Sequence, residues 1–390
     1  MRGHIDSVTL RSIRGWAAND DGDPVLLTVS INASVVDSVR SSIPRPDLAG
    51  SGRKDLGFNI HLVEALKIGD VVSVTGEGDE HLIGSPFKVT RLLATKEDKS
   101  LCLITRDMKI LEIGPSFNPI TPRSGGWNSF CLDHATQQEL QAKYSGQQPI
   151  ERIEPVDYVW TAGSIESVVP EAQHGTFDAV IASHVLEHIP DPIGFLQSVA
   201  TLLKEDGLLS LIIPDKRWMF DFFKSLSTTS DFLAAHSQLR TRHTNKTAFD
   251  NLAYNVSEAG QIAWGPKLLS EFHFFGNDPL RNAKAAFDNT LEQPDTPYVD
   301  FHATVYTPSS FAQIVLELGQ LGVLPFEVEC RFPTSGCEFY VTLRKRQPET
   351  LHLEDLKIQR LALMKQTLEE LAQQARWLSD KHTATPISEP

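Results

Sequence analysis

A short apolar run that ends at a glycine constrains the fold of this chain more than any other feature. Residues 110–113 read Ile-Leu-Glu-Ile, and Gly114 opens a loop of small and polar residues that runs to Pro119. Such a run is typical of a buried parallel strand, and glycine permits a turn in which the backbone can approach a ligand closely. The pattern alone is shared by purely structural strand ends and by nucleotide or nucleoside sites at the carboxyl edge of a parallel sheet.

The chain beyond this loop alternates between strand and helix patterns. Strands are predicted at residues 128–132, 156–160, 177–183 and 208–213, and helices at 135–144 and 193–203. A later helix at 309–321 precedes two strands at 326–332 and 338–344, which predict a terminal β-hairpin. This alternation indicates a Rossmann-like α/β domain at residues 105–346, with a mostly parallel sheet. A long polar insertion at 216–300 interrupts it, and we expect this segment to form a lid or an acceptor site.

Two further segments flank the α/β domain. Residues 1–93 contain short alternating runs separated by turn clusters, which favour a small all-β sandwich. Residues 350–382 predict a C-terminal helix whose apolar positions keep a 3-4-3-4-3 spacing, at Leu361, Met364, Leu368, Leu371, Ala375 and Leu378. This spacing is typical of a coiled-coil seam, which would join the chain to a partner or a second copy. A single amphipathic helix packed on its own domain explains the spacing equally well.

Composition narrows the classes of partner. The formal net charge of −14 argues against nucleic acid as the main partner, because phosphate binding requires a basic face. Four cysteines without a CxxC pair are typical of reduced thiols in the cytoplasm. No apolar run is long enough to span a membrane, and the N-terminus lacks the apolar core of a signal peptide. We therefore expect a cytoplasmic protein that does not span the membrane.

Four motifs in order resemble those of class I S-adenosylmethionine-dependent methyltransferases. They are Leu111–Pro115, Asp133 at the end of the second strand, Phe177–Ile189 (FDAVIASHVLEHI) and Leu202–Leu208 (LLKEDGL). The chain departs from the family pattern where Ser116 and Asn118 replace the usual second and third loop glycines. In residues 1–93, Gly15–Ala17, Arg45–Leu48 and Gly57–Phe58 resemble the β-domains that accompany bacterial carbohydrate-processing enzymes.

The resemblance implies S-adenosylmethionine as cofactor. Glu112 and the following loop suit its amino-acid end. Asp133 lies nineteen positions after Gly114, where a carboxylate can accept both ribose hydroxyls, although an aspartate there can also cap a helix. The loop around Gly163 resembles the adenine side, and Ser183 and His184 are expected near the sulfonium. The predicted cofactor contacts are Glu112, Gly114, Pro115, Ser116, Asn118, Asp133, His134, Gly163, Ser164, Ser183 and His184.

Methyl transfer to a hydroxyl requires a general base in addition to alignment. The candidates are His243, Asp215, His184 and His302, with His243 first, because Arg242 beside it can orient a polar acceptor. Asp215 is expected to hold the His243 imidazole or to act as the base itself. Each histidine also has a purely structural interpretation. His184 and His188 have the i, i+4 spacing of a metal pair, but His188 can equally close a helical turn, and we predict no metal.

These patterns predict an O-methyltransferase that acts on a sugar hydroxyl of a bacterial glycan or glycan precursor. One alternative is a methyltransferase for another small metabolite. Another is a non-catalytic scaffold or binding protein in a polysaccharide assembly, which would use the C-terminal helix for association. A nicotinamide oxidoreductase is disfavoured, because no G-x-G-x-x-G pattern begins at Gly114.

Overall fold

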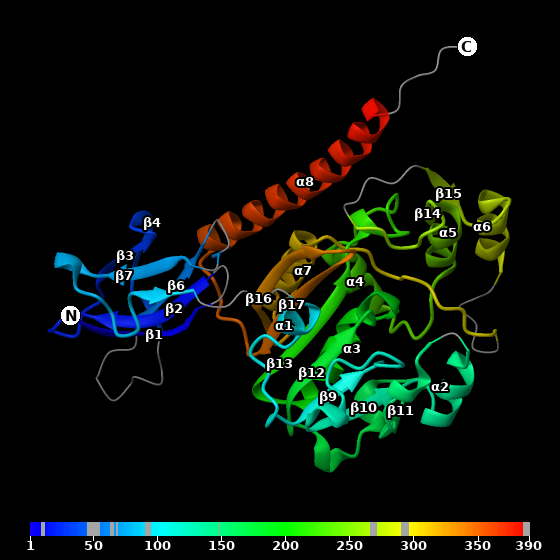
Figure 1. The fold of residues 1–390 in the computed structure, drawn as a ribbon, viewed down its shortest axis with the longest axis horizontal. Helices are drawn as coiled ribbons and strands as arrows, with labels where there is room; N and C mark the ends of the chain where they lie inside the picture. The colour runs from blue at the N-terminus through cyan, green and yellow to red at the C-terminus, as the bar shows by residue number, and fades with distance from the viewer. Residues whose placement is uncertain are drawn as a thin grey trace. The chain divides into compact units, whose positions relative to one another are not determined.

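Two compact units make up the chain, Met1–Thr95 and Lys96–Pro390. They are shown in Figure 1, a computed structural model. The structure describes residues 1–8, 12–44, 55–62, 66–67, 69–89, 95–146, 148–265, 271–289 and 296–384. Helix α1 (Lys96–Ser100) already belongs to the second unit, where the Ser210 hydroxyl donates to the Ser100 carbonyl at 2.6 Å.

Two antiparallel sheets form the described part of the first unit. One has the order β1 (Arg2–Val8), β2 (Ser12–Ala18), β6 (Asp55–His61), β5 (Ile43–Pro44), and the other has the order β4 (Ser34–Arg40), β3 (Leu26–Ile31), β7 (Val71–Thr75), β8 (Phe87–Lys88). Ile13 and Phe58 from the first sheet share one apolar core with Val29 and Val74 from the second. The predicted all-β architecture is therefore confirmed. The Arg45–Leu48 motif lies outside the described residues.

The second unit is built on a seven-stranded sheet in which the strand order reverses at β9, the first of these strands in the sequence. The order is β11 (Tyr158–Val159), β10 (Ser129–Asp133), β9 (Ile110–Ile113), β12 (Phe177–Ser183), β13 (Leu203–Pro214), β17 (Glu338–Lys345), β16 (Phe326–Ser335). The first five strands are parallel, and β17 runs antiparallel to both of its neighbours. This arrangement confirms the predicted Rossmann-like sheet with a terminal hairpin. Its crossover point lies between β9 and β12, where ligands bind in open α/β sheets.

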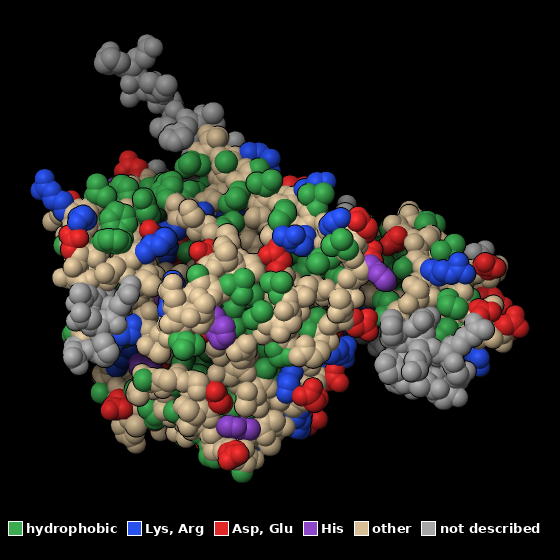
Figure 2. Space-filling model, turned by 180° about the vertical axis from the view of Figure 1, so that it is seen from behind, with side chains coloured by type: hydrophobic (Ala, Val, Ile, Leu, Met, Phe, Trp, Pro, Cys, Tyr) green, Lys and Arg blue, Asp and Glu red, His purple; other side chains and the backbone are tan. Residues whose placement is uncertain are grey.

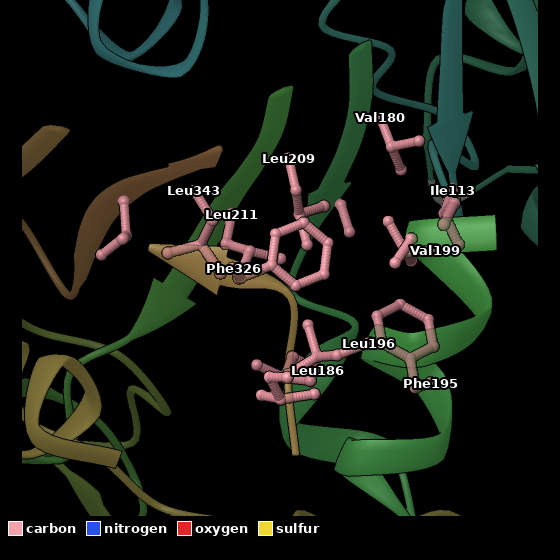
Figure 3. Close-up of a cluster of buried hydrophobic side chains, with 14 of the residues drawn as sticks. Ile113, Val180, Leu186, Phe195, Leu196, Val199, Leu209, Leu211, Phe326 and Leu343 are labelled. Carbon is pink, nitrogen blue, oxygen red and sulfur yellow. The ribbon is translucent and has the colours of Figure 1, made fainter. Parts of the chain in front are cut away.

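Apolar stripes on two helices bury much of this sheet. Helix α3 (Pro192–Leu202) packs Leu196 and Val199 against Leu209 and Leu211 of β13, and Phe326 joins the same cluster (Figure 3). Helix α7 (Pro308–Gln320) adds an apolar stripe to this core. Helix α2 (Gln137–Tyr144) begins in a capping box formed by Thr136 and Glu139, which satisfies orphan amides at its start. The packed layers hold the strand ends in fixed positions.

The described part of the insertion contains three α-helices, which make up less than half of it, and a short antiparallel strand pair. Its elements are α4 (Thr229–Ser237), α5 (Asn245–Tyr254), β14 (Val256–Glu258), β15 (Phe272–Phe274) and α6 (Pro279–Asp288). Its exposed aromatic side chains include Phe274, Phe275, Phe287 and Tyr298. Figure 2 shows hydrophobic side chains gathered at the upper left, over this part of the larger unit. The insertion therefore presents an aromatic surface.

The C-terminal helix α8 (Leu353–Ala384) packs on α7 through a largely polar face. The Ser309 hydroxyl donates to Glu370 at 2.8 Å, and Trp377 is buried in an aromatic cluster with Trp218. Leu361 and Leu368 of the predicted seam lie on the outside, 53% and 67% exposed. The helix thus packs on its own domain and still leaves part of the seam uncovered. No helix in the described part of the chain has the length and apolar character needed to cross a bilayer.

Candidate functional site

The loop after β9 forms a tight turn at the carboxyl edge of the sheet. Gly114 has a left-handed φ of +64°, and a Cβ added there would lie 3.2 Å from Cγ2 of Val185. Ser116 is also left-handed, with φ +51°, and the Asn118 amide donates to the Pro115 carbonyl at 2.9 Å. The Ser116 hydroxyl is buried and has no hydrogen-bond partner among the described residues. The loop therefore brings backbone close to Val185 and leaves one polar atom unsatisfied.

Glu112 lies beneath this loop. Its carboxylate accepts hydrogen bonds from the amides of Ile120 and Thr121, at 2.7 and 3.0 Å, and from the Thr121 hydroxyl at 2.7 Å. Burial raises the pKa of the carboxyl group, while these donors favour its charged form. Because both oxygens are engaged, Glu112 holds the far end of the loop in place. A direct cofactor contact would require it to exchange one of these bonds.

Asp133 lies at the end of β10 and is 2% exposed. One carboxylate oxygen accepts from the Ser116 amide at 2.9 Å, which fixes the left-handed residue of the neighbouring loop. The other oxygen is 2.7 Å from both the amide and the Nδ1 atom of His134. The structure thus brings together Asp133, Ser116 and His134, three of the residues predicted to contact the cofactor. The imidazole occupies the position on Asp133 that a ribose hydroxyl would need.

The predicted adenine-side loop follows β11. Gly163 is left-handed, with φ +78°, and its carbonyl accepts from the indole Nε1 of Trp160 at 2.9 Å. The carbonyl of Ser164 accepts from the Ser167 hydroxyl at 2.6 Å, at the start of a short 3₁₀ turn. β11 lies two strands from β9 on the same side of the crossover. The three loops after β9, β10 and β11 therefore leave the same edge of the sheet.

His184 follows Ser183 at the end of β12, in a left-handed conformation with φ +54°. Its Nε2 lies 2.7 Å from Glu338, and its Nδ1 lies 3.5 Å from Glu187. Burial alone would lower the pKa of His184, but the two carboxylates raise it to about 9. At neutral pH the imidazole is protonated and lacks the lone pair of a general base. The structure therefore does not support His184 as the base.

Asp215 is also unsuited to the role predicted for it. Its carboxylate is fully buried and forms a bidentate pair with the Arg217 guanidinium, with contacts of 2.9 and 2.5 Å. The Thr334 hydroxyl donates to it at 2.5 Å, and Arg217 continues to Gln373 of α8 at 2.8 Å. None of its described contacts involves His243. The prediction that Asp215 orients His243 is wrong in this structure, because the carboxylate anchors α8 instead.

His243 and His302 are both buried and both held by a neighbouring side chain. Nε2 of His243 lies 2.9 Å from the Tyr298 hydroxyl, and its Nδ1 has no partner among the described residues. Nδ1 of His302 lies 2.5 Å from Asp221. Arg242, predicted to orient an acceptor, donates to the Thr296 carbonyl. The sequence analysis did not identify Tyr298, Asp221 or Glu187. Glu187 could have been found, because it is a carboxylate between His184 and His188 in an apolar run.

Comparisons with known proteins agree with this geometry. Residues 91–260 match the family model described as a methyltransferase domain. A stretch of 56 residues is 45% identical to a ubiquinone biosynthesis O-methyltransferase of Xanthomonas campestris pv. campestris (strain B100), covering 14% of this chain and 22% of that protein. The chain thus spans about a fifth of the length of the curated relatives that it matches.

The similar solved structures share less sequence identity with this chain. An S-adenosylmethionine-dependent methyltransferase from Methanosarcina mazei is 12% identical, covers 63% of this chain and 95% of its own, and has a TM-score of 0.32. One from Mesorhizobium loti is 11% identical, covers 65% of this chain and 100% of its own, and has a TM-score of 0.33. The match of residues 91–260 to a methyltransferase domain agrees with the predicted enzyme class and cofactor.

Proposed function

Taking this methyltransferase domain as the premise, we propose that the chain is an S-adenosylmethionine-dependent O-methyltransferase that acts on a sugar hydroxyl of a bacterial glycan or glycan precursor. The enzyme class is supported by the contact between the loop after β9 and Asp133, where the Ser116 amide donates to the carboxylate. This contact joins two strand ends beside the crossover of the sheet.

The residues at this edge fit the proposed cofactor. The Ser116 hydroxyl is a buried polar atom without a partner among the described residues, and a Cβ added at Gly114 would crowd Cγ2 of Val185 at 3.2 Å. Gly114–Asn118 would hold the amino-acid end, Asp133 the ribose, and Gly163 and Ser164 the adenine side. When bound, S-adenosylmethionine supplies a methyl group on a positively charged sulfur. The role of the loops is to fix its orientation.

The insertion supports an acceptor that is a hydroxyl compound. Its exposed Phe274, Phe275 and Tyr298 offer aromatic faces on which a sugar ring can stack. A hydroxyl must lose its proton during transfer, and His243 is the candidate base. Because His243 is only 4% exposed whereas Tyr298 is 54% exposed, the proton would pass to the imidazole through the Tyr298 hydroxyl. This route uses the 2.9 Å contact between the two side chains.

Two experiments test the proposal in sequence. Calorimetry with adenosylmethionine, its demethylated product and NAD tests the cofactor, and we expect the first two to bind and NAD to fail. Labelled-methyl transfer to fractionated surface glycans of the source cell then tests the acceptor. Binding of NAD alone would refute the enzyme class. Label in a fraction free of carbohydrate would refute only the glycan acceptor.

A second acceptor class has an observation in its favour. The segment that is 45% identical to a ubiquinone biosynthesis O-methyltransferase supports a small-molecule acceptor in place of a glycan. Both acceptors present a hydroxyl, so the proposed chemistry at His243 and Tyr298 is the same. The labelling experiment separates them, because a small-molecule product would extract into organic solvent and a glycan product would not.

A further inference from the structure

Three side chains from distant parts of the sequence converge beside the end of β12. They are Glu187 and His188, in the 3₁₀ turn after that strand, and His302, which lies just before α7. Each can offer one ligand atom to a common point, and these atoms lie within 4.8 Å of one another. The backbone holds the two segments together, because the amides of Ala303 and Thr304 donate to the Glu187 carbonyl at 2.7 and 3.2 Å.

Each imidazole in this group already has one nitrogen fixed by a carboxylate. Nδ1 of His302 lies 2.5 Å from Asp221, and Nδ1 of His188 lies 3.0 Å from Asp300. The remaining nitrogen on each ring is Nε2, and that of His188 lies 3.9 Å from the Glu187 carboxylate. A carboxylate behind each ligating histidine is the usual way in which proteins fix the tautomer and orientation of a metal ligand.

Glu187 is a fully buried carboxylate without a hydrogen bond. Its side chain is 1% exposed, and neither oxygen has a hydrogen-bond partner among the described residues. The cationic group nearest to it among the described contacts is Nδ1 of His184 at 3.5 Å, which is long for a hydrogen bond, and that imidazole is bonded to Glu338 through Nε2. Burying a charge in this way is costly unless a cation compensates it.

The carboxylates around this group outnumber the lysines that are paired with them. Among the described residues in this network, the carboxylates are Glu187, Glu338, Asp221 and Asp300. The fixed cations paired with them are Lys96 on Glu338 and Lys224 on Asp221. Protons on the histidines or a bound cation must therefore balance the remaining negative charge.

We propose that Glu187, His188 and His302 form a binding site for a divalent transition-metal cation. Two imidazoles and one carboxylate suit Mn²⁺, Fe²⁺, Co²⁺ or Zn²⁺, whereas Mg²⁺ and Ca²⁺ favour all-oxygen ligands. A cation about 2.0–2.2 Å from each ligand atom places those atoms roughly 3–3.5 Å apart. The three side chains must therefore draw together modestly on binding.

The cation also has a role in the reaction, and this part rests on the proposed function. An acceptor hydroxyl that occupies an open coordination position would have a lower pKa. Its O–H bond would break with the electron pair retained on oxygen, and the proton would pass through Tyr298 to His243. Tyr298 is near this site, because Asp300 lies 3.4 Å from its hydroxyl and 3.0 Å from His188.

The site can be tested by metal binding alone. The full-length protein, freed of metal with a chelator, is titrated with Mn²⁺ and monitored by electron paramagnetic resonance, and with Zn²⁺ by calorimetry. We expect one saturable site per chain, and at least tenfold weaker binding in His188→Gln. His236→Gln is the matched control, because His236 is 33% exposed and 2.9 Å from Asp191, as His188 is 32% exposed and 3.0 Å from Asp300. The control should bind like wild type.

Glu187→Gln supplies an independent ligand variant, and circular dichroism verifies that each variant is folded. If His188→Gln does not fold, the same tenfold loss in Glu187→Gln supports the site. Absence of saturable Mn²⁺ and Zn²⁺ binding to wild type would overturn the proposal, as would equal affinity in the ligand and control variants. Adenosylmethionine is titrated with chelator present. If adenosylmethionine binds and neither cation does, the metal site is refuted and the proposed function is not. If a cation binds and adenosylmethionine does not, the proposed function is refuted and the metal site is not.

Discussion

The His134 ring lies where a ribose hydroxyl would bind Asp133, so substitutions of Asp133 and of His134 should change cofactor affinity in opposite directions. In the described structure the Asp133 carboxylate accepts from the Ser116 amide at 2.9 Å and from the His134 amide and ring at 2.7 Å. Removing the carboxylate with Asp133→Ala deletes the proposed ribose acceptor and the anchor of the left-handed Ser116. A hydrogen bond to a charged group contributes about 1.5–3 kcal/mol. We therefore expect cofactor affinity to fall by roughly 10- to 150-fold, at 1.4 kcal/mol per factor of ten.

His134→Ala should act in the other direction. The His134 ring competes with the proposed ribose contact for one oxygen of Asp133, so removing it frees the site. Because the His134 side chain is 50% exposed, water screens its bond to the carboxylate, and its net value is about 1 kcal/mol. We expect adenosylmethionine to bind up to about fivefold more tightly. His134 was itself predicted as a cofactor contact, and in that case the variant would bind more weakly.

Isothermal calorimetry of wild type and both variants with adenosylmethionine measures these changes. His174→Ala is a suitable control, because this histidine bonds only to backbone carbonyls of Glu166 and Val169 in the described contacts. Unchanged affinity in Asp133→Ala would refute the ribose assignment. A tenfold loss in His134→Ala, with a normal control, would refute the competition and restore His134 as a ligand.

Three further predictions concern stability and assembly. Asp215→Asn leaves Arg217 buried without its anion and should cost about 3–5 kcal/mol in urea unfolding, whereas normal stability with lost turnover would restore Asp215 as the base. Burial lowers the pKa of Lys216 to about 8 from 10.5. The unfolded chain therefore holds more protons between these values, and stability should rise over that window by roughly 3 kcal/mol. Lys216→Met should lack this rise, and equal slopes for both proteins would contradict the assignment. Leu361→Glu with Leu368→Glu should lower the mass in light scattering without lowering stability, because both side chains are exposed; identical masses would exclude the seam as an interface.

Assembly has to be tested by these substitutions, because a truncation would disturb the core. Removing residues 350–390 would delete Trp377, which packs against Trp218 at 5.4 Å between ring centroids. It would also remove Gln374, which donates to the Phe222 carbonyl at 2.8 Å. A truncated chain that loses mass and cofactor binding together would report on folding, not on the seam.

The fold was predictable because its signals are local. The strand after Lys109, the glycine at 114 and the acid at 133 each lie within a few residues of the structure they specify. Their order along the chain then determines a sheet that crosses over at β9. The contact between Ser116 and Asp133 follows from the same geometry, since adjacent parallel strands end at one edge.

The histidine chemistry was less predictable, for a physical reason. The i, i+4 spacing of His184 and His188 implies a helix, but His184 is left-handed and residues 186–188 form a 3₁₀ turn. The two rings consequently meet different partners, Glu338 for His184 and Asp300 for His188. His302, 114 positions beyond His188 in the sequence, reaches the same site only through the path of the insertion. No local sequence pattern predicts that the chain brings His302 back beside His188.

The burial of His243 determines how it can act as a base. It is 4% exposed, and its Nε2 faces the Tyr298 hydroxyl at 2.9 Å, so an acceptor reaches Tyr298 first. If the proton travels through this hydroxyl, Tyr298→Phe breaks the relay while keeping the ring. We expect Tyr298→Phe and His243→Ala each to lose about a hundredfold or more in turnover and to retain cofactor binding.

The double variant distinguishes a relay from two separate roles. Residues that act as one unit are not additive, so a relay predicts that the double variant is no slower than the worse single variant. Multiplied losses would instead assign separate roles to the two side chains. A normal rate in Tyr298→Phe beside a slow His243→Ala would mean that the imidazole takes the proton directly. That result would require the segment around Phe301, whose amide lies 3.4 Å from the His243 ring, to open when the acceptor binds.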